Sequence, residues 1–89
     1  MSKPVIYHPL FKRNFRKRIY RKKRLVAAYK EALNKFLESP EHPDLRPHDL
    51  RREMDGLKSF WVENDCRVIY RERETYFEFY DIGNHKEVY

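Results

Sequence analysis

Four side chains in the second half of the chain have the chemistry needed to break a ribose–phosphate linkage: His48, Arg67, His85 and Tyr89. In RNA scission without a metal, a base removes the proton of the ribose 2′-OH, the oxygen attacks the adjacent phosphate, and an acid protonates the departing 5′-oxygen. A cation stabilises the charge that builds on phosphorus. Histidine suits both proton transfers because its unperturbed pKa is about 6.5. Two imidazoles, a guanidinium and a phenol therefore suit metal-independent cleavage of RNA.

Three further residues near this set each allow two interpretations. Asp65 is either a turn former or a carboxylate that supports the catalytic groups. Trp61 is either a core residue or a platform on which an exposed base stacks. Cys66 is expected to be a small buried apolar residue rather than a nucleophile, since no Cys–His pairing is visible in the sequence. His8 and His42 are expected to be structural.

The cysteine and glycine contents argue against cofactor chemistry. A single cysteine cannot form an intrachain disulfide, and the four histidines are too scattered for a zinc site. Two glycines are too few for a phosphate-binding loop or a dinucleotide fingerprint. We therefore expect no cofactor and no metal. The sequence also shows neither a signal peptide nor an apolar span, so we expect a cytoplasmic protein without a membrane partner.

Positive charge is concentrated in the first part of the chain. The net charge is +11 over residues 1–37 and −5 over residues 38–89, which together give +6. The basic candidates for RNA contact in this region are Arg16, Lys17, Arg21, Lys22, Lys23 and Arg24. We expect Trp61, Arg71 and Lys86 to add RNA contacts from the second half. Such a surface fits polyanionic RNA, and an acidic protein would satisfy it equally well.

The 89 residues are enough for one small domain, 1–89, with an α+β pattern. Residues 5–7 are apolar and β-branched or aromatic, and predict a first strand that His8-Pro9 ends. Helical spacing of apolar residues runs from about 10 to 39. One helix of that length would overshoot a domain of this size, so we expect a helical hairpin with a break around 20–24.

After a proline-containing loop, the period of the sequence changes from helical to alternating. Three short aromatic or β-branched segments, 57–63, 66–73 and 76–82, are separated by polar turns and predict strands linked by hairpins. One face of this sheet can cover the helices, and the other is left polar, aromatic and basic. The expected fold is therefore an N-terminal strand and two-helix hairpin packed on an antiparallel sheet of three to four strands.

The second half of the sequence resembles the RelE/ParE toxin superfamily, and most closely its YafQ-like and RelE/StbE branch. The matching segments are His48-x-Leu50, Gly56-Leu57-Lys58-Ser59-Phe60, Asp65-x-Arg67-Val68-Ile69-Tyr70 and Asp81-Ile82-Gly83-x-His85-x-x-Val88-Tyr89. The resemblance implies the RelE-like fold and a bacterial type II toxin that cuts messenger RNA in the ribosomal A site without a metal. It also implies that a cognate acidic antitoxin binds and silences the toxin.

Carried over by matched position, His48 and His85 resemble the imidazole acid and base, and Asp65 a supporting carboxylate. Arg67 resembles the phosphate-contacting arginine, and Tyr89 the terminal aromatic residue near the scissile phosphate. Two other positions depart from the branch, since Trp61 stands in place of a histidine and Asp81 in place of an arginine. Arg52 also replaces a usual glycine. Stabilisation of the charge at phosphorus would then depend on Arg67, Arg71 or Lys86.

Two other functions remain open from the sequence. A ParE-type toxin with the same fold would poison DNA gyrase instead of cutting RNA, although the histidines argue against this. A basic module without catalysis would bind an acidic protein or structured RNA, and substitution of the four site residues would then be silent.

Overall fold

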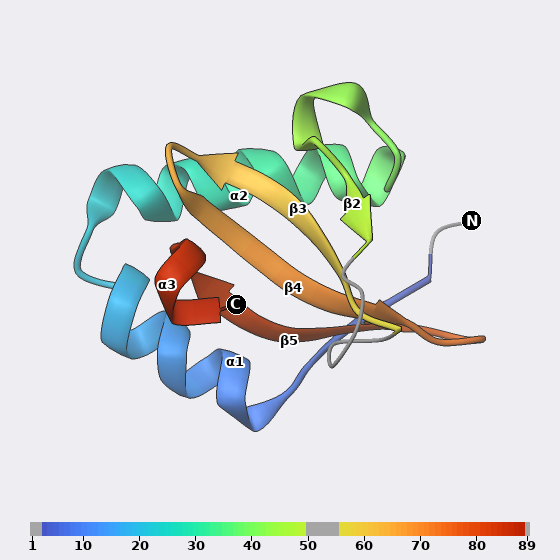
Figure 1. Ribbon diagram of the computed structural model, residues 1–89, viewed down its shortest axis with the longest axis horizontal. Helices are drawn as coiled ribbons and strands as arrows, with labels where there is room; N and C mark the ends of the chain where they lie inside the picture. Colours follow the sequence, from blue (N-terminus) through green and yellow to red (C-terminus); the bar gives the residue numbers. More distant parts are fainter. Residues whose placement is uncertain (1–2, 50–55, 89) are drawn as a thin grey trace.

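The helices and strands follow the order expected for an α+β domain (Figure 1). The structure is a computed structural model and describes residues 3–49 and 56–88. In chain order the elements are β1 (Val5–Tyr7), α1 (Pro9–Asn14), the π-helix η1 (Phe15–Ile19), α2 (Lys23–Glu38), the 3-10 helix η2 (Pro43–Leu45), β2 (His48–Asp49), β3 (Lys58–Glu63), β4 (Cys66–Glu72), β5 (Phe77–Gly83) and α3 (His85–Val88). Within these residues, no helix is both long and apolar enough to cross a membrane.

The helical hairpin is confirmed. His8 caps the first arm, because its Nδ1 accepts a hydrogen bond from the Leu10 amide at 3.0 Å and Pro9 occupies the first turn. The π-helix η1 continues α1 directly, and the chain then turns through residues 20–22 before α2 begins. The longest dimension of the molecule is 33 Å. An unbroken helix of about 28 residues would be about 42 Å long, so the break keeps both arms on the sheet.

The three strands expected to be linked by hairpins are also confirmed as β3, β4 and β5. The complete sheet is larger than this set, with strand order β1-β5-β4-β3-β2. β1 pairs with β5 in parallel, whereas the other neighbours are antiparallel, so the sheet is mixed and has five strands. The difference from an all-antiparallel sheet arises because the helical hairpin carries the chain from β1 across one face before β5 returns beside it.

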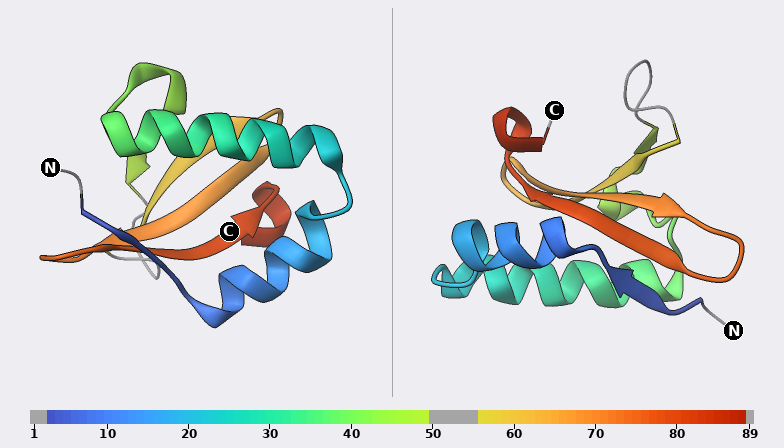
Figure 2. Two further views of the ribbon diagram at one scale, coloured as in Figure 1. Left: turned by 180° about the vertical axis from the view of Figure 1, so that it is seen from behind. Right: turned by 90° about the horizontal axis from the view of Figure 1, so that it is seen from below.

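The two faces of the sheet are covered very unequally. Figure 2 shows α1 and α2 on one face and the short α3 on the other. Phe36 of α2 is fully buried among the rings of Phe60, Tyr70, Phe77 and Phe79, with centroid distances of 4.8–5.4 Å. These contacts form the main core. The opposite face has only a small second cluster, so most of it is available for function.

Candidate functional site

The short helix α3 carries His85 onto the less covered face of the sheet. Its Val88 packs with Leu57, Ile69 and Tyr80 in the second apolar cluster. Asn84 and Glu87 cap the helix reciprocally: Asn84 Oδ1 accepts from the Glu87 amide at 2.9 Å, and Glu87 Oε1 accepts from the Asn84 amide at 2.7 Å. The end of the chain was expected only to carry two functional residues past the last strand. The capping-box spacing, Asn-x-x-Glu, is the sequence signal that indicates this helix.

Three of the expected site residues lie together where α3 meets the β3–β4 turn. Asp65 Oδ2 accepts a hydrogen bond from the His85 backbone amide at 3.2 Å. The other oxygen, Oδ1, lies 3.9 Å from Nη2 of Arg67. The hydrogen bond of Asp65 therefore reaches across 20 residues of sequence. Asp65 therefore lies in a turn and also connects the start of α3 with the start of β4.

His48 lies on β2, at the edge of the same sheet, and is exposed. It pairs with Ser59, which in turn pairs with Ile69, and these three side chains share one face because directly opposed residues in antiparallel strands point the same way. Arg67 is on that face too, because it precedes Ile69 by two residues on β4. From strand spacing, the His48 and Arg67 Cα atoms are about 12 Å apart. The other expected residue, Tyr89, and the departure at Arg52 lie outside the described residues.

Trp61 is half-buried on β3 and pairs with Arg67 in register. Its indole Nε1 donates to the Asn64 carbonyl at 2.6 Å. The guanidinium carbon of Arg46 lies 4.1 Å from the ring centroid, in a cation–π contact. Trp61 is absent from the two buried clusters, so it belongs to the surface of the sheet. Sequence reasoning missed Arg46, whose left-handed φ of 47° after η2 places it over the indole.

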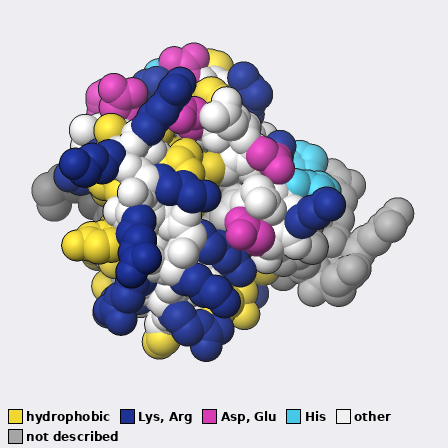
Figure 3. Space-filling view, turned by 90° about the vertical axis from the view of Figure 1, so that its left-hand side faces the viewer, with side chains coloured by type: hydrophobic (Ala, Val, Ile, Leu, Met, Phe, Trp, Pro, Cys, Tyr) yellow, Lys and Arg dark blue, Asp and Glu magenta, His cyan; other side chains and the backbone are white. Residues whose placement is uncertain are grey.

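A basic groove leads from the helical hairpin to this site. It has a volume of about 450 Å³ and lies between the η1–α2 connection, the β3–β4 turn and the end of β5. Its lining carries four basic residues, Arg18, Lys22, Lys23 and Arg24, and three acidic ones, Glu63, Asp65 and Glu87. Asn84, next to His85, also lines it. Figure 3 shows Lys and Arg side chains spread over this side of the molecule. The groove connects the basic run with the residues next to His85.

The other expected RNA contacts are distributed less evenly. Arg16, Lys17 and Arg21 are exposed on the helical hairpin, and Lys86 is exposed on α3. Arg24 is largely exposed but forms an ion pair with Glu63 at 3.1 Å. Arg71 is half-buried on β4 and shares the face of Arg67. The basic surface therefore extends from the helices across to the open face of the sheet.

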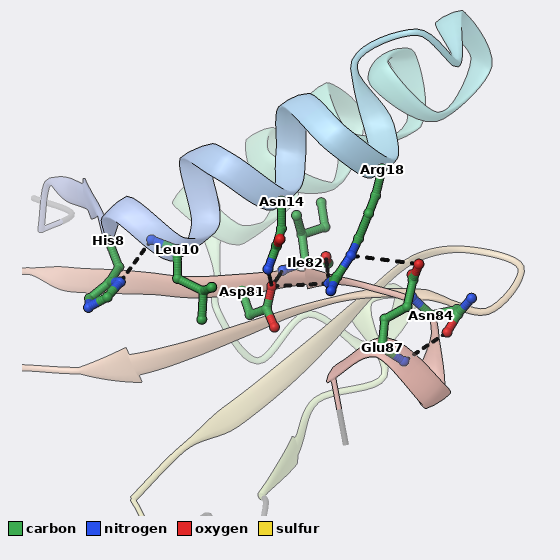
Figure 4. Close-up of polar contacts among 8 residues, drawn as sticks. All are labelled: His8, Leu10, Asn14, Arg18, Asp81, Ile82, Asn84 and Glu87. Atoms are coloured by element: carbon green, nitrogen blue, oxygen red, sulfur yellow. Dashed lines mark hydrogen bonds and ion pairs between the residues drawn. The ribbon is translucent and has the colours of Figure 1, made fainter.

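Asp81 is buried and takes no part in the open face. One oxygen, Oδ1, accepts from Asn14 Nδ2 at 2.7 Å, from the Ile82 amide at 2.8 Å and from Arg18 Nη1 at 3.3 Å (Figure 4). Its carboxylate is thus directed toward α1 and η1. Asp81 therefore serves to fix the helical arm on β5.

Cys66 is buried at the start of β4, as expected for a small apolar residue. Burial raises the pKa of its thiol to about 11, and the nearby negative charge of Glu87 adds to the shift. Because only the thiolate reacts, we expect iodoacetamide to alkylate Cys66 at pH 8 at least about 100-fold more slowly in the folded protein than in urea. Mass spectrometry of timed samples measures both rates. Similar rates would contradict an inert thiol.

A second groove, of about 600 Å³, lies on the helical side of the molecule. Its walls are aromatic, from Tyr7, Phe11, Phe15 and Tyr29, and Lys12 and Arg16 contribute basic groups. The Tyr7 and Tyr29 hydroxyls are 3.1 Å apart, and burial followed by this hydrogen bond raises the pKa of Tyr29. None of the residues expected to be catalytic lines this groove. It is therefore a feature separate from the candidate site.

Comparisons with known proteins agree with the fold and with the resemblance. Residues 4–89 match the family described as bacterial toxin of type II toxin-antitoxin system, YafQ. YafQ from Escherichia coli BL21(DE3) has a similar structure, with a TM-score of 0.79, 17% identity and 99% of both chains covered. The E. coli DinJ–YafQ complex gives 0.77, 21% and 99% of both chains.

The Mycobacterium tuberculosis toxin–antitoxin complex RelBE2 gives a TM-score of 0.74 at 22% identity, with 96% of this chain and 93% of that chain covered. No curated protein matches the sequence at a significant level. The structural similarities establish the fold, and the family match covers nearly the whole chain. The chain therefore belongs to the YafQ toxin family of bacterial type II toxin–antitoxin systems.

Proposed function

We propose that this toxin is a ribosome-dependent endoribonuclease that cuts messenger RNA in the A site by metal-independent acid–base catalysis. The observation that carries the proposal is the cluster of Asp65, Arg67 and His85, in which one carboxylate contacts both the start of α3 and the guanidinium. The basic groove beside the cluster supplies a path for the phosphate backbone. Membership of the YafQ toxin family supports the same activity.

Each group in the proposed site has a distinct task. His85 and His48 exchange protons with the attacking 2′-oxygen and the departing 5′-oxygen. Arg67 stabilises the additional negative charge on the phosphate in the transition state. Asp65 holds the backbone of His85 and orients Arg67. We assign Tyr89, by the resemblance alone, to a position near the scissile phosphate.

The proposal is tested by programming bacterial ribosomes with a defined message, adding the protein and mapping the new 5′ ends. We expect cleavage within the A-site codon. A matched message with a single 2′-deoxy nucleotide before the cut should resist cleavage, because the attacking oxygen is missing. An intact normal message at stoichiometric protein would overturn the proposal. Inhibition of gyrase supercoiling in its place would favour a ParE-type activity.

We also propose an acidic antitoxin as the protein partner and the bacterial cytoplasm as the location. Two of the similar structures, DinJ–YafQ from E. coli and RelBE2 from M. tuberculosis, are described as toxin–antitoxin complexes. The net charge of +11 over residues 1–37 supports an acidic partner, since it provides a large positive surface on the helical hairpin. Co-expression with the product of the adjacent gene and measurement of message cleavage test this proposal. Full activity in a stable complex would contradict silencing.

Ribosome binding should depend strongly on salt, because lysines of the groove displace counterions from phosphates. Replacing Lys22 and Lys23 with glutamine should reduce the slope of log Kd against log salt by between about 1.4 and 1.8, at about 0.7–0.9 per phosphate contact. Fluorescence anisotropy on labelled ribosomes over a salt series measures the slope. The control is Arg13→Gln with Lys30→Gln, which removes the same charge from exposed positions outside the groove. An equal reduction in both variants would contradict a specific path.

A further inference from the structure

One arginine of the basic run, Arg18, is bound to acceptors of the protein, although it also lines the basic groove. Arg18 lies in η1, and its side chain is 21% exposed. Nη1 donates to the Ile82 carbonyl at 2.9 Å and to Asp81 Oδ1 at 3.3 Å, while Nε lies 3.6 Å from Glu87 Oε2. Figure 4 shows the guanidinium between the end of β5 and α3. A single side chain therefore joins three elements: η1, β5 and α3.

Gly83 leaves the space that this arrangement requires. A Cβ atom on Gly83 would lie 2.8 Å from Arg18 Nη1, 2.7 Å from Glu87 Oε1 and 3.0 Å from Glu87 Cβ. The first two separations are shorter than a real Cβ atom tolerates and the third is tight, so a larger residue would displace the guanidinium or the carboxylate. The glycine of the Gly-x-His motif thus permits close packing of Arg18 against Glu87.

Glu87 transmits the contact with Arg18 to the start of α3. One carboxylate oxygen faces Arg18, and the other accepts from the Asn84 amide at 2.7 Å. A helix of four residues does not hold its own orientation, because so few intrahelical bonds cannot offset the cost of nucleation. The direction of α3, and with it the backbone of His85, depends on such external contacts.

We propose that Arg18 is a positioning residue for His85, acting through Glu87 and the end of β5, and is not an RNA ligand. The inference rests on the proposed function for its effect on catalysis, but its structural part is independent of cleavage. This role distinguishes Arg18 from its neighbours Arg16 and Lys17. Both neighbours are exposed, and among the described residues neither forms a hydrogen bond with β5 or α3 of the kind that Arg18 forms. The basic hairpin then has two tasks, binding RNA and fixing the catalytic helix.

Amide hydrogen exchange tests the structural part without any RNA. In Arg18→Gln, the amides of Glu87 and Val88, which donate to Asn84, should exchange about 10-fold faster or more, because α3 opens more often. Amides of α2 serve as the internal control for global unfolding. Arg13→Gln, an exposed arginine on the same arm, should leave both regions unchanged. Unchanged exchange at Glu87 and Val88 in Arg18→Gln would overturn the proposal.

Message cleavage then distinguishes positioning from RNA binding. We expect kcat of Arg18→Gln to fall between about 10- and 100-fold with KM nearly unchanged, as for a misplaced catalytic group. Arg18→Lys should recover little, because an ammonium keeps the charge but cannot span the three acceptors. The double variant with Glu87→Gln should be no slower than the slower single variant. Multiplicative losses, or a raised KM that lysine restores, would show that Arg18 contacts RNA.

If the unaltered protein does not cut message on the ribosome, the proposed nuclease function fails. The exchange experiment still decides whether Arg18 fixes α3. Conversely, active protein with unchanged exchange in Arg18→Gln leaves the nuclease intact and rejects the positioning role. The two proposals therefore fail on different observations.

Discussion

Changing His85 to alanine should lower the rate of message cleavage on the ribosome by about 10²- to 10⁴-fold, the usual contribution of a general acid or base. The imidazole is exposed at the start of α3, beside the groove through which RNA would pass. Its backbone amide is held by Asp65, so the substitution removes the ring without removing the contact that fixes the helix. Single-turnover cleavage of ribosome-bound message measures the loss.

Ribosome binding and folding should be unchanged in His85→Ala, since neither the basic hairpin nor the core is altered. Sedimentation with ribosomes and the thermal unfolding midpoint check both. His42→Asn is the matched control, because the His42 side chain caps η2 by accepting from the Asp44 amide at 3.1 Å, and asparagine can take over the cap. Cleavage at the normal rate by His85→Ala, or an equal loss in His42→Asn, would remove His85 from the mechanism.

The helices and the hairpin-linked strands could be predicted because their signals are local. Tyr29 and Phe36 of α2 recur at helical spacing, and both are buried against the sheet. Phe60 and Val62 alternate with the half-buried Trp61 and Glu63 and enter the same core. A periodic apolar pattern specifies which side of an element is buried, whatever its partner. The break between η1 and α2 followed from size alone, since one long helix cannot fit on a small sheet.

The parallel pairing of β1 with β5 could not be predicted in the same way. Val5 and Phe77 come from opposite ends of the chain, and no local pattern indicates which edge a first strand joins. The two-residue strand β2 is too short to show any period. α3 is also too short for a helical pattern, although its capping box was present in the sequence. Pairings of this kind are decided by the packing of the whole domain.

The candidate site, too, could be predicted only in part. The residue types indicated the chemistry, but only the structure shows that Asp65 contacts both the His85 amide and Arg67. The run of basic residues looks uniform in sequence, yet Arg18 is directed inward and Arg16 outward. Which arginine is structural depends on acceptors from β5 and α3 that lie far away in the chain.

The position of Asp81 determines which cation can act on the phosphate. The YafQ-like resemblance places an arginine there, but here the residue is a buried carboxylate bound by Asn14 and Arg18. Arg18 is in turn bound to the Ile82 carbonyl of β5 and to Glu87 of α3, so its donors are already engaged within the protein. Of the two remaining arginine candidates, Arg67 and Arg71, Arg67 lies beside the carboxylate of Asp65, which also holds the His85 amide. We therefore expect Arg67 to bear the charge stabilisation that the missing arginine would supply.

Arg67→Gln should accordingly reduce kcat for message cleavage by about 10²- to 10³-fold, as the loss of one donor to a developing charge does. Arg71→Gln is the matched comparison, since Arg71 shares the strand and the face of Arg67. In the register of β4 and β5, Arg71 stands opposite Glu78, farther along the strand from α3. We expect that variant mainly to raise KM, because it weakens binding of RNA in the ground state and the transition state equally. Arg67→Lys should recover part of the rate, since it keeps a cation but loses the forked donor. Single-turnover rates and ribosome affinities measured in parallel separate these effects. Equal losses of kcat at both positions would show that no single arginine takes the role of the arginine that the resemblance places at position 81.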